Sequence, residues 1–181
     1  VVNTLADEFY FCNPFSLKMD DIDAEAFEKT GRAVVKAFGI RKRCFHIEFF
    51  VLKSDKEGLA KKGEFVALEC NMRPAGGNLP DLTDYANSVS IYDIYADVIC
   101  YDENRQDMSK PKYYAFASHR RDELDYKYLD LKIIYDYESQ LCMYGRYPKS
   151  LSLAMCDEYF YAIFPTKDLG YQFDRKVREK R

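Results

Sequence analysis

Residue types that bind divalent cations and phosphate occur in two short runs of this sequence. Residues 45–49 place Glu48 among aromatic and aliphatic side chains, and residues 68–77 read Leu-Glu-Cys-Asn-Met-Arg-Pro-Ala-Gly-Gly. Mg²⁺ takes oxygen ligands from one or two carboxylates and completes its shell with water and substrate phosphates. An arginine binds the same phosphates through its planar guanidinium. Together the two runs indicate a site for magnesium and a nucleoside triphosphate.

Both runs alternate as β-strands do, with successive side chains on opposite faces. The polar face is expected to hold His46, Glu48 and Phe50, and on the second strand Phe65, Ala67, Glu69, Asn71 and Arg73. The apolar face is expected to hold Phe45, Ile47, Phe49, Val51, Val66, Leu68, Cys70 and Met72. Residues 53–63, rich in lysine, aspartate and glycine, suit a hairpin loop. Pairing would bring Glu48 close to Glu69 and Asn71, and facing carboxylates repel unless a cation lies between them.

A single strand carboxylate more often just faces water, but the second run is more specific. Its Glu-x-Asn-x-Arg-Pro pattern and Gly-Gly turn, together with the earlier glutamate in an aromatic strand, resemble the metal-binding core of the ATP-grasp superfamily. That superfamily includes biotin carboxylase, carbamoyl-phosphate synthase and the carboxylate–amine ligases. The resemblance is good over residues 32–99 and weaker towards the C-terminus. It implies an α+β fold, the C-terminal lobe of an ATP-grasp domain (1–104), mostly antiparallel sheet with flanking helices, followed by a small appended α/β segment (105–181).

The resemblance also implies roles for individual residues. Glu48 resembles the first magnesium-binding glutamate and Glu69 the second, which bridges two metal ions, with Asn71 as the amide ligand beside it. Arg73 resembles the catalytic arginine that steadies the transferred phosphoryl group. The backbone of Gly76 and Gly77 would approach a nucleotide phosphate without a Cβ in the way. Residues 74–78 lack the glutamate base of biotin carboxylase, which argues against bicarbonate as the substrate.

The activity implied is an ATP- and Mg²⁺-dependent ligation, with Mn²⁺ as an alternative metal. A carboxylate would be activated as an acyl-phosphate and attacked by an amine or similar nucleophile, so the substrates would be small molecules. No glycine-rich nucleotide loop precedes Arg32, so we expect the N-terminal substrate and nucleotide lobes of such ligases to be absent from these 181 residues. We therefore expect a C-terminal fragment of a longer ligase, inactive in isolation. The alternative is a non-catalytic binding or assembly module that keeps the ATP-grasp scaffold.

Composition limits the other partners. At 181 residues and 48% hydrophobic, the chain can build one sizeable core or a core with a small lobe. Its formal net charge of −3 provides no general attraction to nucleic acid or anionic membranes. No apolar run approaches 18 residues, so no membrane span is expected. The sequence does not determine the oligomeric state, and a homodimer is one possibility.

Six cysteines without metal-binding spacing suggest reduced core residues and a cytoplasmic location; they are Cys12, Cys44, Cys70, Cys100, Cys142 and Cys156. His46, two residues before Glu48, shares its face. It could serve as an acid–base group or phosphate contact, although a hydrogen-bonded structural histidine is the more common case. One of Arg120 and Arg121 resembles a second substrate-side arginine, but alternation does not choose between them, and loop arginines are more often solvated.

The remaining pattern predicts the elements around this site. Residues 1–15 have an irregular or strand-like pattern. Helices are expected over 23–38, 91–100, 129–137, 151–155 and 168–181, and strands over 113–118, 141–147 and 159–164. Gly39 should end the first helix, and Ser90 with Asp93 gives the second a capping-box-like start. Between the hairpin and residue 91 we expect only a turn.

Overall fold

The computed structural model describes residues 2–3, 9–12 and 24–181, and these form two compact units. Of the described residues, the hairpin unit comprises residues 24–80 and Ser90–Asp107. The sheet unit comprises residues 2–3 and 9–12 together with Asp81–Val89 and Met108–Arg181. Most of the predicted segment 105–181 therefore belongs to the sheet unit, while the predicted division at residue 104 stays a prediction.

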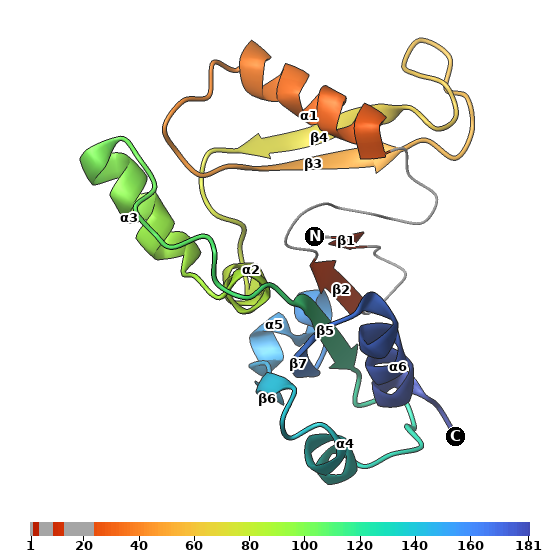
Figure 1. Cartoon of the computed structure of the whole chain (residues 1–181). Coiled ribbons are helices and arrows are strands. Elements are labelled where there is room, and N and C mark those ends of the chain that lie inside the picture. Colours follow the sequence, from red (N-terminus) through yellow and green to blue (C-terminus); the bar gives the residue numbers. More distant parts are fainter. Residues whose placement is uncertain (1, 4–8, 13–23) are drawn as a thin grey trace. The chain divides into compact units, whose positions relative to one another are not determined.

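In the hairpin unit, helix α1 (Ala24–Ala37) covers one face of a two-stranded sheet formed by β3 (His46–Val51) and β4 (Phe65–Asn71) (Figure 1). The Phe27 ring lies 5.5 Å from that of Phe49 and 5.2 Å from that of Phe65, so one helical residue contacts both strands. Gly39 follows the helix with φ +62° and its N–H donates to the Lys36 carbonyl. This is the left-handed helix ending that the sequence predicts.

A β-bulge in this hairpin corrects the predicted assignment of β4 side chains to faces. Phe49 pairs with Ala67 and Glu48 pairs with Glu69, so Leu68 is an extra residue on β4. Directly paired residues share a face, and Glu48 and Phe49 point to opposite faces. Phe65 and Ala67 therefore lie on the helix-covered face, whereas Glu69 and Asn71 lie on the other. The prediction that all four share the polar face is wrong, because strict alternation holds only on an unbulged strand.

Two helices follow the hairpin, of which the sequence predicted one. Helix α3 (Ile91–Tyr101) begins as expected at Ser90, whose hydroxyl accepts a hydrogen bond from the Asp93 N–H at 3.2 Å. Helix α2 (Leu79–Asn87) replaces the expected turn. Its Pro80 stands in the first turn, where proline is tolerated, and Leu82 and Ala86 are buried one helical turn apart.

The sheet unit is built on a five-stranded antiparallel sheet in the order β1-β2-β5-β7-β6. Its strands are β1 (Val2–Asn3), β2 (Phe9–Cys12), β5 (Tyr114–Arg120), β6 (Leu141–Arg146) and β7 (Glu158–Phe164), and its later helices are α4 (Asp130–Asp136), α5 (Lys149–Met155) and α6 (Lys167–Arg178). The elements predicted over residues 113–181 are confirmed with small shifts at their ends. The strand-like prediction for residues 1–15 is confirmed at β1 and β2, and the rest of that segment lies outside the described residues.

The main core of this unit lies on one face of the sheet. It contains Phe116 from β5, alternate residues of β7, and residues of α4 and α6; its fully or nearly fully buried members are Phe116, Ile133, Phe160, Ala162, Phe164, Phe173 and Val177. Figure 1 shows α6 beside β5. The predicted α+β class with antiparallel sheets and flanking helices is confirmed.

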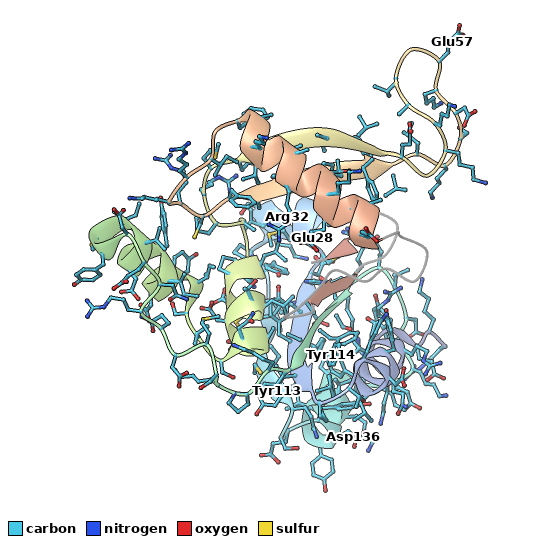
Figure 2. The ribbon with its side chains drawn as sticks, turned by 45° about the horizontal axis from the view of Figure 1, so that its top comes forward. Glu28, Arg32, Glu57, Tyr113, Tyr114 and Asp136 are labelled. Atoms are coloured by element: carbon cyan, nitrogen blue, oxygen red, sulfur yellow. The ribbon has the colours of Figure 1, made fainter. Side chains whose placement is uncertain are left out.

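Asp136 at the end of α4 links that helix to α6. Lys132 and Lys176 both donate hydrogen bonds to the carboxylate of Asp136, which Figure 2 labels. These bonds hold the pKa of Asp136 below its ordinary value. A lowered folded-state pKa contributes stability at neutral pH, and this contribution is lost as the pH falls through the acidic range.

We therefore expect Asp136→Asn to lower the urea midpoint at pH 7, and the difference from the parent chain to shrink as the pH falls below about 3.8, the ordinary pKa of this carboxyl, towards the lower pKa that it has in the folded chain. Urea titrations of both chains between pH 7 and pH 3 would measure this. Equal midpoints at pH 7, or a difference that does not change with pH, would contradict the assignment.

The expectations about membrane-spanning segments and about the cysteines can be compared with the structure. Within the described residues, none of the helices is long and apolar enough to cross a membrane. The cysteines whose side chains are described, Cys44, Cys70, Cys100, Cys142 and Cys156, are all free, as expected. Only Cys156 among these five is buried and Cys100 is exposed, so the prediction that they are mostly core residues is wrong.

Candidate metal and phosphate site

The β3–β4 register brings the predicted cation ligands together. Glu48 pairs directly with Glu69, and His46 pairs directly with Asn71. The two pairs are two residues apart along each strand and therefore share the face opposite α1. Their position depends on the bulge at Leu68. If β4 alternated strictly from Phe65 onward, Glu69 would point toward the side that packs on Phe27.

Short contacts of the Asn71 amide connect it to Glu69 and His46, and Glu48 lies close to the His46 ring. The Asn71 amide nitrogen donates to Glu69 Oε1 at 2.6 Å and lies 3.1 Å from His46 Nε2. His46 Nε2 lies 3.8 Å from Glu48 Oε1 and 4.0 Å from Glu69 Oε1. One potential ligand atom from each of His46, Glu48 and Glu69 falls within 4.8 Å of the other two. The convergence predicted for Glu48, Glu69 and Asn71 is therefore present, with His46 added to it.

The chemistry of this donor set suits a divalent cation. Two carboxylates in a direct cross-strand pair repel each other, and such a pair destabilises a sheet. Both side chains are 52% exposed, so an ion could reach them from solvent. Hard carboxylate and amide oxygens are the ligands that Mg²⁺ and Mn²⁺ take.

Arg73 and the glycines lie in the chain segment just after β4. The Arg73 guanidinium donates to the Pro74 carbonyl at 3.0 Å, and its Nη1 lies 3.9 Å from the position of a Cβ added to Gly76. Gly77 has φ +61°, a conformation that favours glycine. The Arg73 carbonyl lies 3.4 Å from His46 Nδ1. The backbone of Arg73 thus adjoins the carboxylate cluster, while its exposed guanidinium lies close to Gly76.

The arginine pair at the end of β5 does not have the solvated position suggested for loop arginines. The Arg120 side chain is 3% exposed, donates to the Val177 carbonyl at 2.7 Å and bonds Asp130 at 2.6 Å. Its guanidinium lies against the rings of Tyr126 and Phe160. Arg121 donates through Nη1 to the Ser152 carbonyl. Arg120 therefore ties β5 to α4 and α6, because strand β5 extends two residues beyond the predicted end and carries it into the core.

Comparison with known proteins gives a structural match. No family model and no curated protein sequence matches the chain. Among solved structures, the chain is similar to phosphoribosylglycinamide synthetase from Anaerococcus prevotii, with a TM-score of 0.56 and 14% sequence identity. The match covers 96% of this chain and 44% of that protein, so the chain spans less than half of the synthetase. That synthetase is an ATP-grasp ligase.

The chain has an ATP-grasp fold. The predicted fold class is thereby confirmed, and the predicted resemblance to ATP-grasp proteins is confirmed at the level of the fold. At 14% identity the likeness carries the fold and no more, and the roles of individual ATP-grasp residues in this chain stay predictions.

Proposed function

We propose that this chain is part of an ATP- and Mg²⁺-dependent ligase that activates a carboxylate as an acyl-phosphate for attack by an amine or similar nucleophile. The observation that supports this most directly is the cross-strand pair Glu48–Glu69, with Asn71 bonded to Glu69, on an ATP-grasp fold. A bound cation relieves the repulsion between two paired carboxylates, and Mg²⁺ accompanies nucleoside triphosphates in phosphoryl transfer.

In this proposal Glu48 and Glu69 would hold the cation through their exposed carboxylates, and Asn71 would contribute its amide oxygen after its side chain turns. Mg²⁺ or Mn²⁺ held there would supply charge neutralisation for the phosphates. The hydrogen bond from Asn71 to Glu69 Oε1 orients the carboxylate before metal enters. Orientation fixed in advance reduces the entropic cost of assembling the site.

Arg73 and the Gly76–Gly77 turn form the anion-binding side of the proposed site. The guanidinium offers parallel N–H groups that match two oxygens of a phosphate or carboxylate. Gly77 allows the left-handed backbone that turns peptide N–H groups toward an anion. Because the Arg73 carbonyl adjoins His46, the same short segment links this anion side to the carboxylates.

The reaction proceeds in two displacements. An oxygen of the substrate carboxylate attacks the γ-phosphorus of ATP, the bond from that phosphorus to the β–γ bridging oxygen breaks, and ADP leaves. The amine then attacks the acyl carbon, inorganic phosphate leaves with the bonding electrons, and the amine loses a proton to form an amide. Phosphoryl transfer depends mainly on positioning and charge neutralisation, which the side chains above would supply.

The rest of the proposed ligase would lie outside this chain. Nucleotide-contacting lysines and the substrate pocket of ATP-grasp ligases belong to lobes that we expect this chain to lack. We therefore propose that the isolated chain binds metal, binds ATP weakly and turns over no substrate. Its partners would be small carboxylate and amine molecules rather than nucleic acid or membrane, and its location the cytoplasm.

Calorimetric titration of the chain with Mg²⁺ and Mn²⁺ tests the proposal. We expect saturable binding that weakens by at least about tenfold in Glu69→Gln, since one of two charged ligands is lost. The matched control is Glu57→Gln, which removes another exposed carboxylate, in the loop between β3 and β4 (Figure 2). No binding at millimolar metal, or equal weakening in both variants, would contradict the proposal and favour a scaffold that has lost its metal.

A further inference from the structure

His46 occupies the centre of the carboxylate cluster without a role in the function proposed above. Its side chain is 21% exposed, much less than those of Glu48 and Glu69. Nδ1 lies 3.4 Å from the Arg73 carbonyl, and Nε2 faces Asn71, Glu48 and Glu69. The ring is therefore held with one nitrogen toward the backbone and the other toward the carboxylates.

The Arg73 carbonyl decides which nitrogen carries the proton in the neutral ring. A carbonyl oxygen only accepts hydrogen bonds, so Nδ1 must be the donor. Nε2 then has a lone pair, which accepts from the Asn71 amide at 3.1 Å. Histidines that bind metals commonly donate their other ring N–H to a backbone carbonyl in this way, which fixes the tautomer and the ring orientation.

We infer that His46 binds the cation through Nε2, together with Glu48 and Glu69. The inference rests on the proposed function for this site and names the class of metal that the site selects. Ligand atoms around an octahedral ion with bonds of about 2.1 Å are about 3.0 Å apart in cis positions and about 4.2 Å apart in trans positions. The separations of Nε2 from the two carboxylate oxygens, 3.8 and 4.0 Å, lie between these values.

Strand geometry holds the three ligands together. His46 and Glu48 are two residues apart on β3, so they share a face, and Glu69 lies directly across from Glu48. The bulge at Leu68 adds local twist next to this pair and keeps Glu69 on the same side. In metal binding, the Asn71 amide would give up its contact with Nε2, because the ion would take the lone pair of that nitrogen.

A nitrogen ligand changes the metal preference. Mg²⁺ is a hard cation that prefers oxygen, whereas imidazole suits first-row transition metals, whose affinity rises from Mn²⁺ to Co²⁺ and beyond. A His–Glu–Glu set should therefore bind Mn²⁺ and Co²⁺ in preference to Mg²⁺ in the chain without nucleotide. His46 would be the residue that sets this preference, since the carboxylates alone suit either class.

The test is electron spin-echo spectroscopy of Mn²⁺ bound to the chain, combined with Mn²⁺ and Mg²⁺ titrations. The chain contains two histidines, His46 and His119, and His119 is 1% exposed within β5. We expect nitrogen modulation from a directly bound imidazole, replaced by the ¹⁵N pattern when histidine is ¹⁵N-labelled. In His46→Gln the modulation should vanish and the ratio of Mn²⁺ to Mg²⁺ affinity should fall about tenfold.

Glu69→Gln serves as the comparison, because it should weaken both metals and leave the nitrogen modulation in place when Mn²⁺ is raised to saturation. If Mn²⁺ binds, with no nitrogen modulation and with the affinity ratio unchanged in His46→Gln, the inference is wrong and the proposed function stands. If the parent chain binds no metal, both are wrong. Circular dichroism and thermal melting of His46→Gln would establish that the variant is folded.

Discussion

Gly170→Ala should destabilise the sheet unit by about 2 kcal/mol or more, because the cost of overpacking exceeds the gain in helix propensity. A Cβ added to Gly170 in α6 would lie 1.9 Å from Cε2 and 2.2 Å from Cδ2 of Phe116. Phe116 is fully buried and packs edge-on against Phe164 and Tyr171, so its ring has no open space into which to move. Overpacking a core costs about 1–3 kcal/mol and at times more. The gain from replacing a helical glycine is only about 1 kcal/mol.

Urea unfolding of Gly31→Ala provides a matched control. Gly31 lies inside α1 and nothing lies within 4 Å of its added Cβ, so the same substitution should stabilise by up to about 1 kcal/mol. Phe116→Leu combined with Gly170→Ala should recover part of the loss, since the two sites share one space. A Gly170→Ala chain as stable as its parent would show that α6 does not pack on β5 as described.

Arg73→Ala, introduced into a complete ligase that contains this chain, should lower turnover by about 10²–10³-fold while changing thermal stability little. Under the proposed function, Arg73 contacts the phosphoryl group as negative charge is redistributed, and losing one such contact costs about 3–4 kcal/mol of the activation barrier. Its guanidinium is exposed, with a hydrogen bond to the neighbouring Pro74 carbonyl, so folding depends little on it. The measurement is ADP release in the presence of the carboxylate substrate, alongside a melting curve.

Two further arginine variants serve as comparisons, one for the shape of the side chain at position 73 and one for loss of a surface arginine. Arg73→Lys keeps the charge but loses the planar fork, and should recover only a small part of the activity. Arg32→Ala removes an arginine from the surface of α1, where it pairs with Glu28 (Figure 2), and should leave turnover unchanged. A collapse of thermal stability in Arg73→Ala would make Arg73 a structural residue and refute its assigned role.

The elements that could be predicted are those whose signals are local. The apolar stripe that includes Phe27 and the glycine at 39 identify α1, and Ser90 with Asp93 identifies the start of α3. Helix α2 was missed because the Pro/Gly/Asn content of residues 74–80 resembles a turn. A signal was present: Pro80 in the first turn, with Leu82 and Ala86 spaced by four residues.

The candidate site was predictable only in part. Alternation along β3 places His46 and Glu48 on one face, and that follows from two-residue periodicity alone. On β4 the same reasoning fails, because the bulge at Leu68 moves Phe65 and Ala67 to the face opposite Glu69. A bulge arises from the pairing of two strands and from the packing of Phe65 on Phe27, neither of which is encoded in the periodicity of one strand.

Arg120 illustrates the same limit outside the site. Nothing in the run Ser118–His119–Arg120 distinguishes a buried arginine from a solvated one, since charged residues are mostly exposed. Its burial follows largely from partners far along the chain, namely the Val177 carbonyl and the Phe160 ring, which pack on it together with the nearer Tyr126 ring.

By itself, the sequence determined which residue types could bind a cation and phosphate, the strands that carry them, and a resemblance specific enough to anticipate an ATP-grasp fold. Only the tertiary structure decided the register that sets Glu48 against Glu69, the bulge that keeps both on one side, and the orientation of His46 through the Arg73 carbonyl. The physical reason is that periodicity is a property of one strand, whereas register and side-chain tautomer depend on the strand that lies beside it.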